Sequence, residues 1–515
     1  MSLLVDLQSM IGAALQSPLL VATRASRDYG HGTAQNPNTP KITSPERTVV
    51  IRSSRNLGGL CLVFGLFLAP AVELRGGEQD PPNILVFLAD DVDAKDYGCY
   101  GNDSIRTPNI DALAASGLRC DNAFLTTSQC SPTRISVLTG KYPHATGAED
   151  LHTPLPKDQT FVSTYLKDRD YFCGHMLKTH YGPNGNDQFD WYSKNLDDFP
   201  EFIEATEQRP FFMWVGFRDA HRPYQKGAVS PPHDPAKVEV PPYLVDDQAT
   251  REDLALYYDE ISRMDEAIGR MMEQLNKRGL TENTLVVFFG DNGRPFPRCK
   301  GTLYDSGIGT PLVFSWPKVI KAGSVYDGLV SVVDLAPTFL DIAGVKVPSD
   351  MQGHSIAGLF RDTEVEPREY VFAERNWHNC DEHMRSVRSN QYKLIRNAYL
   401  DLPHGTPSDL CASPSWQSLK ALLAKEELTD AQARLFQVPR PEYELYDVIN
   451  DPQELHNLAE DDGYSSVREQ LAGVLEEWRE RTGDFPPTKR RRPDNVNRST
   501  GVKFQQKVPE MLPDE

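Results

Sequence analysis

The chain has 515 residues, of which 73 are Asp or Glu and 54 are Lys or Arg, so its formal net charge is -19. This charge excludes a general nucleic-acid binder, because contacts to phosphates require clustered Lys and Arg. Hydrophobic residues make up 39% and charged residues 25% of the chain, which excludes a disordered or fibrous protein. The length is sufficient to bury a large core, and it favours two domains over one.

Residues 51–71, IRSSRNLGGLCLVFGLFLAPA, have the pattern of a secretory signal peptide. Two arginines precede an apolar run that ends in small residues, as a cleavage site requires. The run is shorter than the ~20 residues of a membrane span, so a permanent anchor is the weaker interpretation. Residues 1–50 are polar and without periodicity, and we interpret them as disordered or as a mis-assigned start, with the true start near Val49 or Val50. We therefore expect an exported protein, periplasmic or secreted.

Eight cysteines are present, and Cys61 lies within the expected signal peptide. The other seven are an odd number, so at least one is unpaired or has another chemical role. They are too sparse for a disulfide scaffold, and the chain has no CxxC motif of the kind found in zinc sites. They are Cys99, Cys120, Cys130, Cys173, Cys299, Cys380 and Cys411.

Short apolar runs alternate with helical patterns along residues 80–370. The runs NILVFLADD, PFFMWVGF and NTLVVFFGDNG are apolar on both faces, as in central parallel strands that helices cover. Between them, TPNIDALAASG has a Thr-Pro helix start and a terminal glycine, and residues 251–279 form a long amphipathic pattern. The alternation predicts an α/β domain with a large mixed, mostly parallel sheet flanked by helices.

After about residue 370 the pattern changes to that of a smaller α+β subdomain over residues 371–485. MRSVRSNQYKLIRN predicts two short strands around a turn, YELYDVINDPQELHNLAED a strand and a loop, and SSVREQLAGVLEEWRER a closing helix. Residues 486–515 form a Pro-rich polar tail, which we interpret as solvated. The basic run KRRR lies in this tail, where a nucleic-acid role is the weaker interpretation.

Two pairs of polar side chains follow two of the predicted strands. They are Asp90 and Asp91 after the first apolar run, and Asp291 and Asn292 after NTLVVFFG. Ligands bind beyond the carboxyl ends of strands in open α/β sheets, so the two pairs can supply four hard oxygen ligands to one point. Such ligation favours Ca²⁺ or Mg²⁺ over transition metals. The alternative is that each Asp caps the helix that follows it.

The stretch CSPTR places Cys130 at a helix start and Arg134 one helical turn later. Unpaired N–H groups and the positive end of the helix dipole favour a polarised or anionic group at residue 130. A buried structural cysteine, a disulfide partner, a metal ligand and a thiolate nucleophile all remain open at this point. A hard cation nearby would match soft sulfur poorly.

The motif CSPTR fits the C-x-P-x-R pattern of type I sulfatases, a family of the alkaline-phosphatase-like superfamily. The resemblance covers about residues 83–480, and its segments include ILVFLADD, YGCYGN, TPNIDALAASG, CSPTRISVLTGKYPHATG, LKTHYG, DAHRPY, FFGDNG, KGTLYDSGIGTPL and YELYDVINDPQELHNLA. In that family the cysteine is oxidised to formylglycine before export, and the hydrated aldehyde is the nucleophile. The resemblance therefore implies a sulfuric ester hydrolase with a catalytic sulfatase domain over residues 80–370, modified by a formylglycine-generating enzyme in the unfolded chain.

The resemblance also implies roles for residues of the matched motifs. A divalent cation, Ca²⁺ in preference to Mg²⁺, is expected on Asp90, Asp91, Cys130, Asp291 and Asn292. The expected catalytic residues are Cys130, Arg134, Lys178, His180, His221 and Lys300. The chain departs from the family pattern at Leu177, where glycine is usual, and we expect this change to be tolerated.

The implied chemistry follows from the charge of a sulfate ester. One oxygen of the hydrate attacks sulfur in line, while the cation and the basic side chains offset negative charge in the transition state. His221 or Lys300 protonates the leaving oxygen or nitrogen, and His180 takes a proton from the second hydroxyl to expel sulfate. An unoxidised Cys130 lacks that second hydroxyl, so release of sulfate would stall.

Within the family, three segments resemble the N-sulfoglucosamine sulfohydrolases, or heparan N-sulfatases: DNGRPFPRCKGTLY, MRSVRSNQYKLIRN and SPSWQSL. Lys300 departs from the arginine expected in those enzymes, which leaves an O-sulfatase on an algal or glycosaminoglycan polysaccharide as the alternative. Candidate contacts to a sulfated sugar or oligosaccharide are Trp377, His378, Glu382, His383 and Arg385. A polar linker between domains is the other interpretation of that segment.

Two other classes of function stay open from the sequence. A phosphate or phosphonate monoesterase would use a similar metal site, and a non-catalytic binder of sulfated glycans would keep the groove without the nucleophile. The complete C-x-P-x-R motif disfavours the former. An oligomer is compatible with the sequence, and no nucleic-acid partner is expected.

Overall fold

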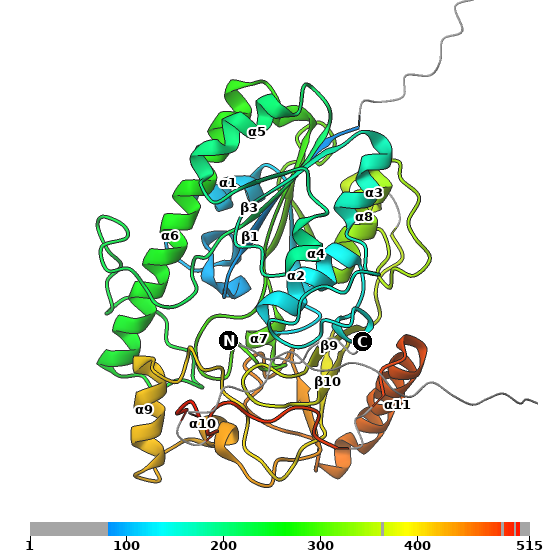
Figure 1. Ribbon diagram of the computed structural model, residues 1–515. Helices are drawn as coiled ribbons and strands as arrows, with labels where there is room; N and C mark the ends of the chain where they lie inside the picture. The colour runs from blue at the N-terminus through cyan, green and yellow to red at the C-terminus, as the bar shows by residue number, and fades with distance from the viewer. Residues whose placement is uncertain (1–80, 362–364, 486–488, 499–500, 505–515) are drawn as a thin grey trace, which may run out of the picture. The chain divides into compact units, whose positions relative to one another are not determined.

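The computed structural model describes residues 81–361, 365–485, 489–498 and 501–504. The expected signal peptide, Cys61 and the block before it lie outside these residues. The described residues belong to one compact unit, built on an eight-stranded and a four-stranded sheet (Figure 1). No helix in the described ranges is long and apolar enough to cross a membrane.

Strand β1 (Asn83–Ala89) lies in the middle of the large sheet and is buried along its whole length. It pairs in parallel with β5 (Phe211–Gly216) on one side and β6 (Thr284–Gly290) on the other. The order of the sheet is β4-β3-β5-β1-β6-β7-β2-β8, and β7 is antiparallel to both neighbours. The remaining strands are β2 (Leu118–Phe124), β3 (Phe172–Leu177), β4 (Trp191–Ser193), β7 (Leu312–Ser315) and β8 (Ser324–Ser331). The prediction of a large mixed, mostly parallel sheet is confirmed.

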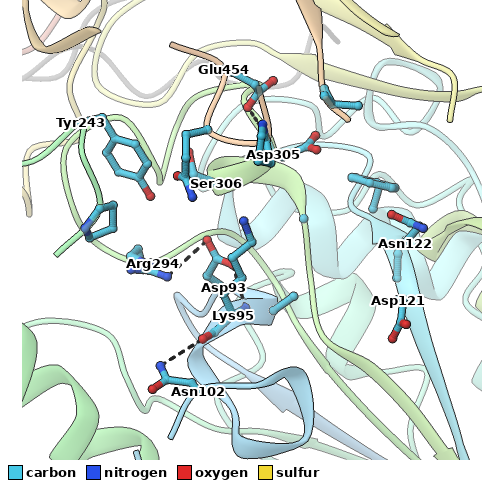
Figure 2. Close-up of a pocket in the computed structure, with 18 of the residues that line it drawn as sticks. Asp93, Lys95, Asn102, Asp121, Asn122, Tyr243, Arg294, Asp305, Ser306 and Glu454 are labelled. Carbon is cyan, nitrogen blue, oxygen red and sulfur yellow. Dashed lines mark hydrogen bonds and ion pairs between the residues drawn. The ribbon is translucent and has the colours of Figure 1, made fainter. Parts of the chain in front are cut away.

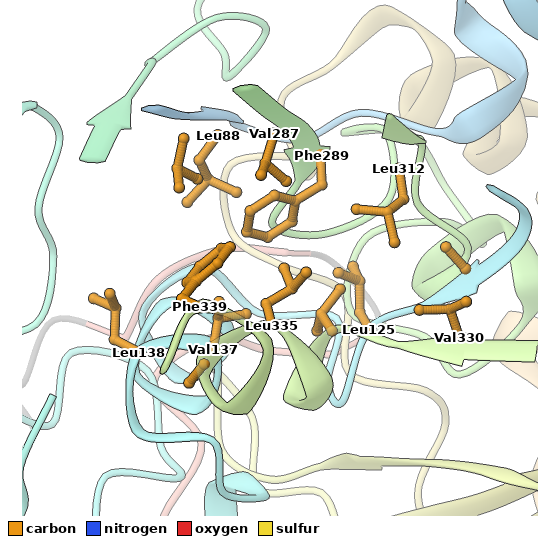
Figure 3. Close-up of a cluster of buried hydrophobic side chains, with 14 of the residues drawn as sticks. Leu88, Leu125, Val137, Leu138, Val287, Phe289, Leu312, Val330, Leu335 and Phe339 are labelled. Carbon is orange, nitrogen blue, oxygen red and sulfur yellow. The ribbon is translucent and has the colours of Figure 1, made fainter. Parts of the chain in front are cut away.

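Helices cover both faces of this sheet, which is why its central strands are apolar throughout. Figure 1 shows α2 (Cys130–Thr139) and α8 (Leu335–Ile342) on one side, and α1 (Pro108–Ala115) and α6 (Gln248–Lys277) on the other. Alternate residues of β1 belong to different cores, with Leu88 in the first and Phe87 in the second. In Figure 3, Leu88, Val287 and Phe289 point from the sheet toward Leu335 and Phe339 of α8.

The two predicted helices of the second face, α1 and α6, are confirmed. Pro108 is the first helical residue of α1, whose backbone N–H groups at Asn109 and Ile110 donate to Asp265 of α6 at 3.1 and 2.8 Å. This carboxylate caps α1 from outside the segment, because Thr107 makes no side-chain cap bond. Helix α6 ends just before Gly279, whose φ of +69° suits glycine.

The smaller sheet is antiparallel, in the order β12-β11-β10-β9. Its strands are β9 (Val371–Arg375), β10 (Met384–Arg388), β11 (Tyr392–Asn397) and β12 (Tyr443–Asp447). The closing helix α11 (Ser465–Thr482) packs Leu471, Leu475 and Trp478 against this sheet. The predicted pair of strands around a turn, the strand that follows and the final helix are all confirmed. The remaining α-helices are α3 (Val162–Leu166), α4 (Pro183–Asn186), α5 (Phe199–Ala205), α7 (Asp305–Ile308), α9 (Pro414–Leu423) and α10 (Asp430–Ala433).

Within residues 489–498 the expectation of a solvated tail is wrong at two positions, whereas residues 489–491, 493 and 497 are exposed. Val496 and Arg498 are buried, and Arg498 Nη1 donates to Glu382 Oε1 at 2.7 Å. The guanidinium of Arg492 lies 3.8 Å from the centre of the Trp377 ring. The tail is polar because it supplies cations to buried carboxylates, which require paired partners. Composition alone does not separate this role from hydration.

Candidate active site

Parallel strands β1 and β6 end at the same edge of the large sheet and bring both predicted pairs of polar side chains together. Asp90, Asp91, Asp291 and Asn292 are fully buried there. Ligand atoms of the three aspartates and of Cys130 lie within 4.8 Å of one another. Asp91 N donates to Asp291 Oδ1 at 3.1 Å, which ties the two strand ends directly.

The donor set fits a hard divalent cation. Among the described residues, Asp90 Oδ1 and Asn292 Oδ1 are buried and have no hydrogen-bond partner. Burial and the neighbouring Asp90 carboxylate raise the pKa of Asp291 to about 6, because several carboxylates converge without enough positive charge. A cation with several oxygen ligands would fill the free acceptors and offset this charge, and such ligation suits Ca²⁺ or Mg²⁺.

Cys130 is the first residue of α2, so the helix begins one residue before the Ser-Pro pair. The extended backbone of Gln129 precedes it, and Gln129 Nε2 donates to the Trp377 carbonyl at 2.9 Å. Burial raises the pKa of the Cys130 thiol above its usual range, against the opposing effect of Lys178. Without modification this side chain is therefore a neutral thiol rather than a thiolate. The seven cysteines within the described ranges are free, so Cys130 forms no disulfide with any of the other six.

Arg134 lies one turn along α2, as the spacing predicted. Its guanidinium contacts Asp291 of the aspartate cluster. Its Nε donates to Asp291 Oδ2 at 2.9 Å, and its Nη1 donates to the Lys178 carbonyl at 3.0 Å. Gly216 at the end of β5 leaves the space for this approach, since a Cβ there would lie 2.6 Å from Arg134 Nη1. The position therefore excludes even a methyl group.

Lys178 and His180 follow β3 at the same edge of the sheet. Lys178 Nζ forms an ion pair with Asp90 Oδ2, and burial, which would raise the pKa of Asp90, is outweighed by Lys178 and Arg134 so that this pKa is lowered. His180 Nε2 lies 2.6 Å from His152 Nδ1. Burial and Lys178 lower the pKa of His180 to about 2, so the ring is neutral near pH 7.

The backbone conformation at Leu177 explains why glycine is usual at this position in the family. Leu177 has φ of +63°, in the left-handed region where an L-residue with a Cβ is strained and glycine is not. The chain tolerates this strain at the last residue of β3, directly before Lys178.

Lys300 and His221 complete the set of predicted catalytic residues around one carboxylate of the metal cluster. Lys300 Nζ donates to Asp91 Oδ2 at 2.8 Å, and His221 Nε2 lies 4.0 Å from the same oxygen. His221 Nδ1 is 2.5 Å from the Arg222 carbonyl, so Nδ1 carries the proton that this bond needs. Nε2 consequently faces the site. The structure thus brings all six predicted catalytic residues together.

Asp409 also belongs to this constellation, and the sequence interpretation missed it. Its Oδ2 accepts from Lys300 Nζ at 2.7 Å and lies 3.6 Å from His221 Nε2. Burial would raise the pKa of Asp409, but Lys300 and His378 outweigh it and lower this pKa. Asp409 lies in the irregular loop between β11 and α9, where no periodic pattern locates a side chain. The only local signal is the Ser-Pro helix start a few residues later.

Of the five predicted sugar contacts, His378 is the one placed near the constellation, since Asp409 and Lys300 both influence its pKa. The Trp377 ring is covered by Arg492, and its Nε1 donates to the Pro493 carbonyl at 3.0 Å. The other three are buried in the C-terminal region, where Glu382 pairs with Arg440 and Arg498, Arg385 pairs with Asp484, and His383 packs nearby.

A separate cavity of about 260 Å³ lies beside the segments that follow β1 and β6 (Figure 2). Arg294 reaches into it and pairs with Asp96 at 2.9 Å and with Asp93 at 3.6 Å. On the other side Asp305 N donates to Glu454 Oε2 at 2.6 Å (Figure 2). The ion pairs of Arg294 link the loop that follows β6 to the loop that follows β1.

The sulfatase family profile matches residues 82–196 and 191–345 of the chain. The chain belongs to the sulfatase family. A second profile, described as N-sulphoglucosamine sulphohydrolase, C-terminal, matches residues 299–438 of this sulfatase. The second match spans Lys300, His378 and Asp409, the part of the site that joins the two sheets.

Two relatives match this sulfatase at the same sequence identity over alignments of similar length. An ulvan-active sulfatase of Formosa agariphila is 32% identical over 434 residues, covering 80% of this chain and 83% of the relative. The human N-sulphoglucosamine sulphohydrolase is 32% identical over 460 residues, covering 78% and 91%. A solved structure of a protein in complex with its substrate D-glucosamine-2-N,6-O-disulfate shares the fold, with a TM-score of 0.58, 21% identity and coverage of 79% and 99%. The sulfatase is accordingly a sulfuric ester hydrolase.

Proposed function

We propose that this sulfatase releases sulfate from a sulfated carbohydrate and that its substrate is of the N-sulfoglucosamine type. The observation that carries the proposal is the match of residues 299–438 to the C-terminal part of N-sulphoglucosamine sulphohydrolases. This segment contributes Asp409, which contacts Lys300 and faces His221 across the site. The match therefore covers two of the residues, Lys300 and Asp409, that we propose lie around the leaving group.

The proposed nucleophile is formylglycine formed from Cys130, together with a divalent cation on the aspartate cluster. When present, the two groups supply an oxygen nucleophile and positive charge for the sulfate oxygens. Arg134 holds Asp291 and the start of α2 in place. Lys178 and Lys300 extend the positive charge to the incoming anion. The neutral His180 is placed to accept a proton, and His221 Nε2 faces the position of the leaving group.

An O-sulfatase acting on an algal or glycosaminoglycan polysaccharide is the second candidate. Lys300 supports it, because the N-sulfatases are expected to have arginine there, and the ulvan-active relative is as similar in identity as the human enzyme. A phosphate or phosphonate monoesterase and a non-catalytic glycan binder are the candidates from other classes.

A screen for sulfate release distinguishes these candidates. Defined glucosamine derivatives with N-, 2-O- or 6-O-sulfate, algal oligosaccharides and a phosphate monoester are incubated with the full chain, and the mass of the peptide that contains residue 130 is measured. Release from the N-sulfated sugar is expected, with formylglycine at residue 130. Cys130→Ser should lose multiple turnover while its unfolding curve stays unchanged. Release of phosphate alone, or sustained turnover by Cys130→Ser, contradicts the proposal.

Chelation tests the proposed cation. Removal of divalent ions is expected to abolish sulfate release, and Ca²⁺ should restore it better than Mg²⁺ because a carboxylate-rich, irregular oxygen set suits the larger ion. Bound ion also stabilises the folded chain by about 2.7 kcal/mol at a concentration 100 times Kd. Full activity and an unchanged unfolding curve after chelation would contradict a resident cation.

We also propose that residues 51–71 direct export to the periplasm or beyond the cell, after modification of Cys130 by a formylglycine-generating enzyme. The signal-like pattern of this segment supports the proposal. N-terminal sequencing of the exported protein tests it, and a mature chain that starts well before Ala71 would refute it.

A further inference from the structure

The catalytic residues open into a cavity that is larger than one sulfate group requires. Asp90, Lys178, His180 and His221 line one end of this cavity, whose volume is about 1060 Å³. Pockets of roughly 300–1000 Å³ accommodate whole drug-sized ligands. The cavity continues past β4, the loop after β5 and the side of α6, so a substrate that extends well beyond the reacting sulfate fits it.

Each of the three carboxylates that line the cavity contacts a neighbouring cation. Asp90 pairs with Lys178. Asp219 accepts from Arg263 Nη2 at 2.7 Å and from Nε at 3.0 Å, and Glu260 pairs with the same guanidinium. Because Asp219 and Glu260 share Arg263, these acids and their two partners leave one negative charge at the cavity.

Three further cations line the same cavity with their charge unmatched. Lys194, Arg218 and Arg270 are exposed, and none has an acidic partner among the residues that the structure describes. In a chain with a net charge of -19, unpaired cations at one cavity are unexpected for a surface without a role. Their position favours anions at the catalytic end of the molecule.

The three cations come from three elements that are fixed relative to the catalytic residues. Lys194 follows β4, and Arg270 lies on the face of α6 that also carries Arg263, seven residues earlier. The Arg218 carbonyl accepts from His221 N at 2.8 Å, which couples this turn to the catalytic histidine. Tyr192, with 45% of its surface exposed, adds an aromatic face to the same wall.

We propose that Lys194, Arg218 and Arg270 form an anion subsite for a second charged group of the substrate, a sulfate ester or a carboxylate on the same sugar or its neighbour. This inference rests on the proposed function and narrows it: the preferred substrates are multiply charged oligosaccharides rather than singly sulfated monosaccharides. Guanidinium and ammonium groups bind such anions through charge-assisted hydrogen bonds. The exposed Tyr192 ring offers apolar contact to the sugar between the two charges.

The test compares two substrates that carry the same terminal sulfate. One is the singly sulfated monosaccharide, and the other is an oligosaccharide with additional sulfates or carboxylates. The variant K194Q/R218Q/R270Q should lose roughly tenfold in kcat/KM on the oligosaccharide, mainly through KM, since exposed charge pairs each contribute modestly. On the monosaccharide its kcat/KM should equal that of the wild type, and the dependence of KM on salt should weaken.

A matched control removes three exposed lysines that do not line the cavity, as K318Q/K321Q/K346Q. The control should leave kcat/KM on both substrates unchanged, although it alters the net charge equally. An equal loss in the control and in the subsite variant, or no loss in either, overturns the subsite.

Binding separates a failure of this inference from a failure of the proposed function. In Cys130→Ser protein, calorimetry with a multiply sulfated heparin oligosaccharide should give a Kd roughly tenfold higher when K194Q/R218Q/R270Q is added. If wild-type protein releases no sulfate but this difference is found, the subsite stands and the proposed reaction fails. If sulfate is released and Kd does not change, the reaction stands and the subsite is refuted.

Discussion

The carboxyl edge of the large sheet and the interior of the C-terminal region both bury acidic side chains, and they satisfy them in different ways. In the C-terminal region, Glu382 Oε1 accepts from Arg498 Nη1 at 2.7 Å and from Gly405 N at 2.8 Å, and its Oε2 accepts from Arg440 Nη2 at 2.8 Å. At the sheet edge, Asp90 Oδ1 and Asn292 Oδ1 accept from no described group. Both oxygens of Glu382 are thus satisfied by protein groups, whereas the free acceptors at the sheet edge lie in a cluster of carboxylates that could hold a cation.

Replacing an acid at the sheet edge should give the largest effect, and on activity. Asp291→Asn removes a negatively charged oxygen from the cation site and a partner of Arg134. Because cation-assisted charge stabilisation amounts to several kcal/mol, kcat/KM for sulfate release should fall by on the order of 10³. Steady-state kinetics and calorimetric titration with Ca²⁺ measure the two losses. If Asp291→Asn keeps more than a tenth of wild-type kcat/KM, the acids at the sheet edge do not serve activity in the way that this comparison requires.

The corresponding change in the C-terminal region should affect stability instead. Glu382→Gln leaves Arg440 and Arg498 without their shared counter-charge, and breaking a buried pair costs about 3–5 kcal/mol of the free energy of unfolding. Where the variant is folded, its kcat/KM should equal that of the wild type.

Urea unfolding measures this loss, with Glu273→Gln as the control. Glu273 forms an exposed pair with Lys277 at 2.9 Å, so its loss should change stability by less than about 0.5 kcal/mol. A catalytic defect in Glu382→Gln at full folding would show that the two charge clusters are coupled.

Buried histidines occur in both regions and predict a shared sensitivity to acid. Burial and Lys178 lower the pKa of His180 to about 2, and burial and Arg375 hold the pKa of His404 well below its usual range. Between pH 6.5 and these lowered values the unfolded chain binds protons that the folded chain refuses. The stability present above pH 6.5 is therefore lost as pH falls, by about 1.4 kcal/mol per pH unit for each ring.

Urea unfolding at pH 7.5, 6.5 and 5.5 measures the free energy of unfolding of the wild type, His180→Gln and His404→Gln. The difference between the wild type and each variant gives the contribution of that histidine to the pH dependence. Each variant should lose about 1 kcal/mol less than the wild type between pH 6.5 and 5.5, because the unfolded ring is already half protonated at pH 6.5. Identical pH dependence in all three proteins would show that these rings titrate normally in the folded chain.

The smallest expected effect concerns Leu177 at the sheet edge. Its backbone is strained, whereas the ion pairs of Glu382 in the C-terminal region involve side chains only. With φ of +63°, a leucine or an alanine is strained and a glycine is not, by roughly 1–2 kcal/mol. Leu177→Gly should therefore be more stable than Leu177→Ala by about 1 kcal/mol, although both lose the same apolar contacts. Thermal unfolding of the pair decides this, and a more stable alanine variant would contradict the strain.

Much of the sheet edge was predictable because its physical causes are local. Apolar runs buried on both faces predict central parallel strands, and parallel strands place their terminal residues at one edge, so Asp90 and Asp291 could be placed near each other. The helix start at Cys130 fixed Arg134 one turn away in the same manner. Each inference needs only the period of a strand or a helix.

The rest of the site depends on contacts between distant, irregular segments. Asp409 lies in a loop without periodicity, and one partner of Glu382, Arg498, comes from a tail whose composition resembles that of a solvated segment. Trp377 is a residue type that commonly stacks on sugars, but Arg492 covers its ring. Neither hydrophobic pattern nor charge content encodes which loop packs on which, so these roles become visible only in three dimensions.

The contact of Asp409 with Lys300 has a consequence for the order of synthesis. A ribosome releases residue 409 more than a hundred residues after residue 300, so the nascent chain can form the large sheet before the carboxylate that closes this end of the site exists. In the finished protein Cys130 is 3% exposed, beyond the reach of another enzyme. The proposed modification of Cys130 therefore has to take place before the chain has folded around this residue.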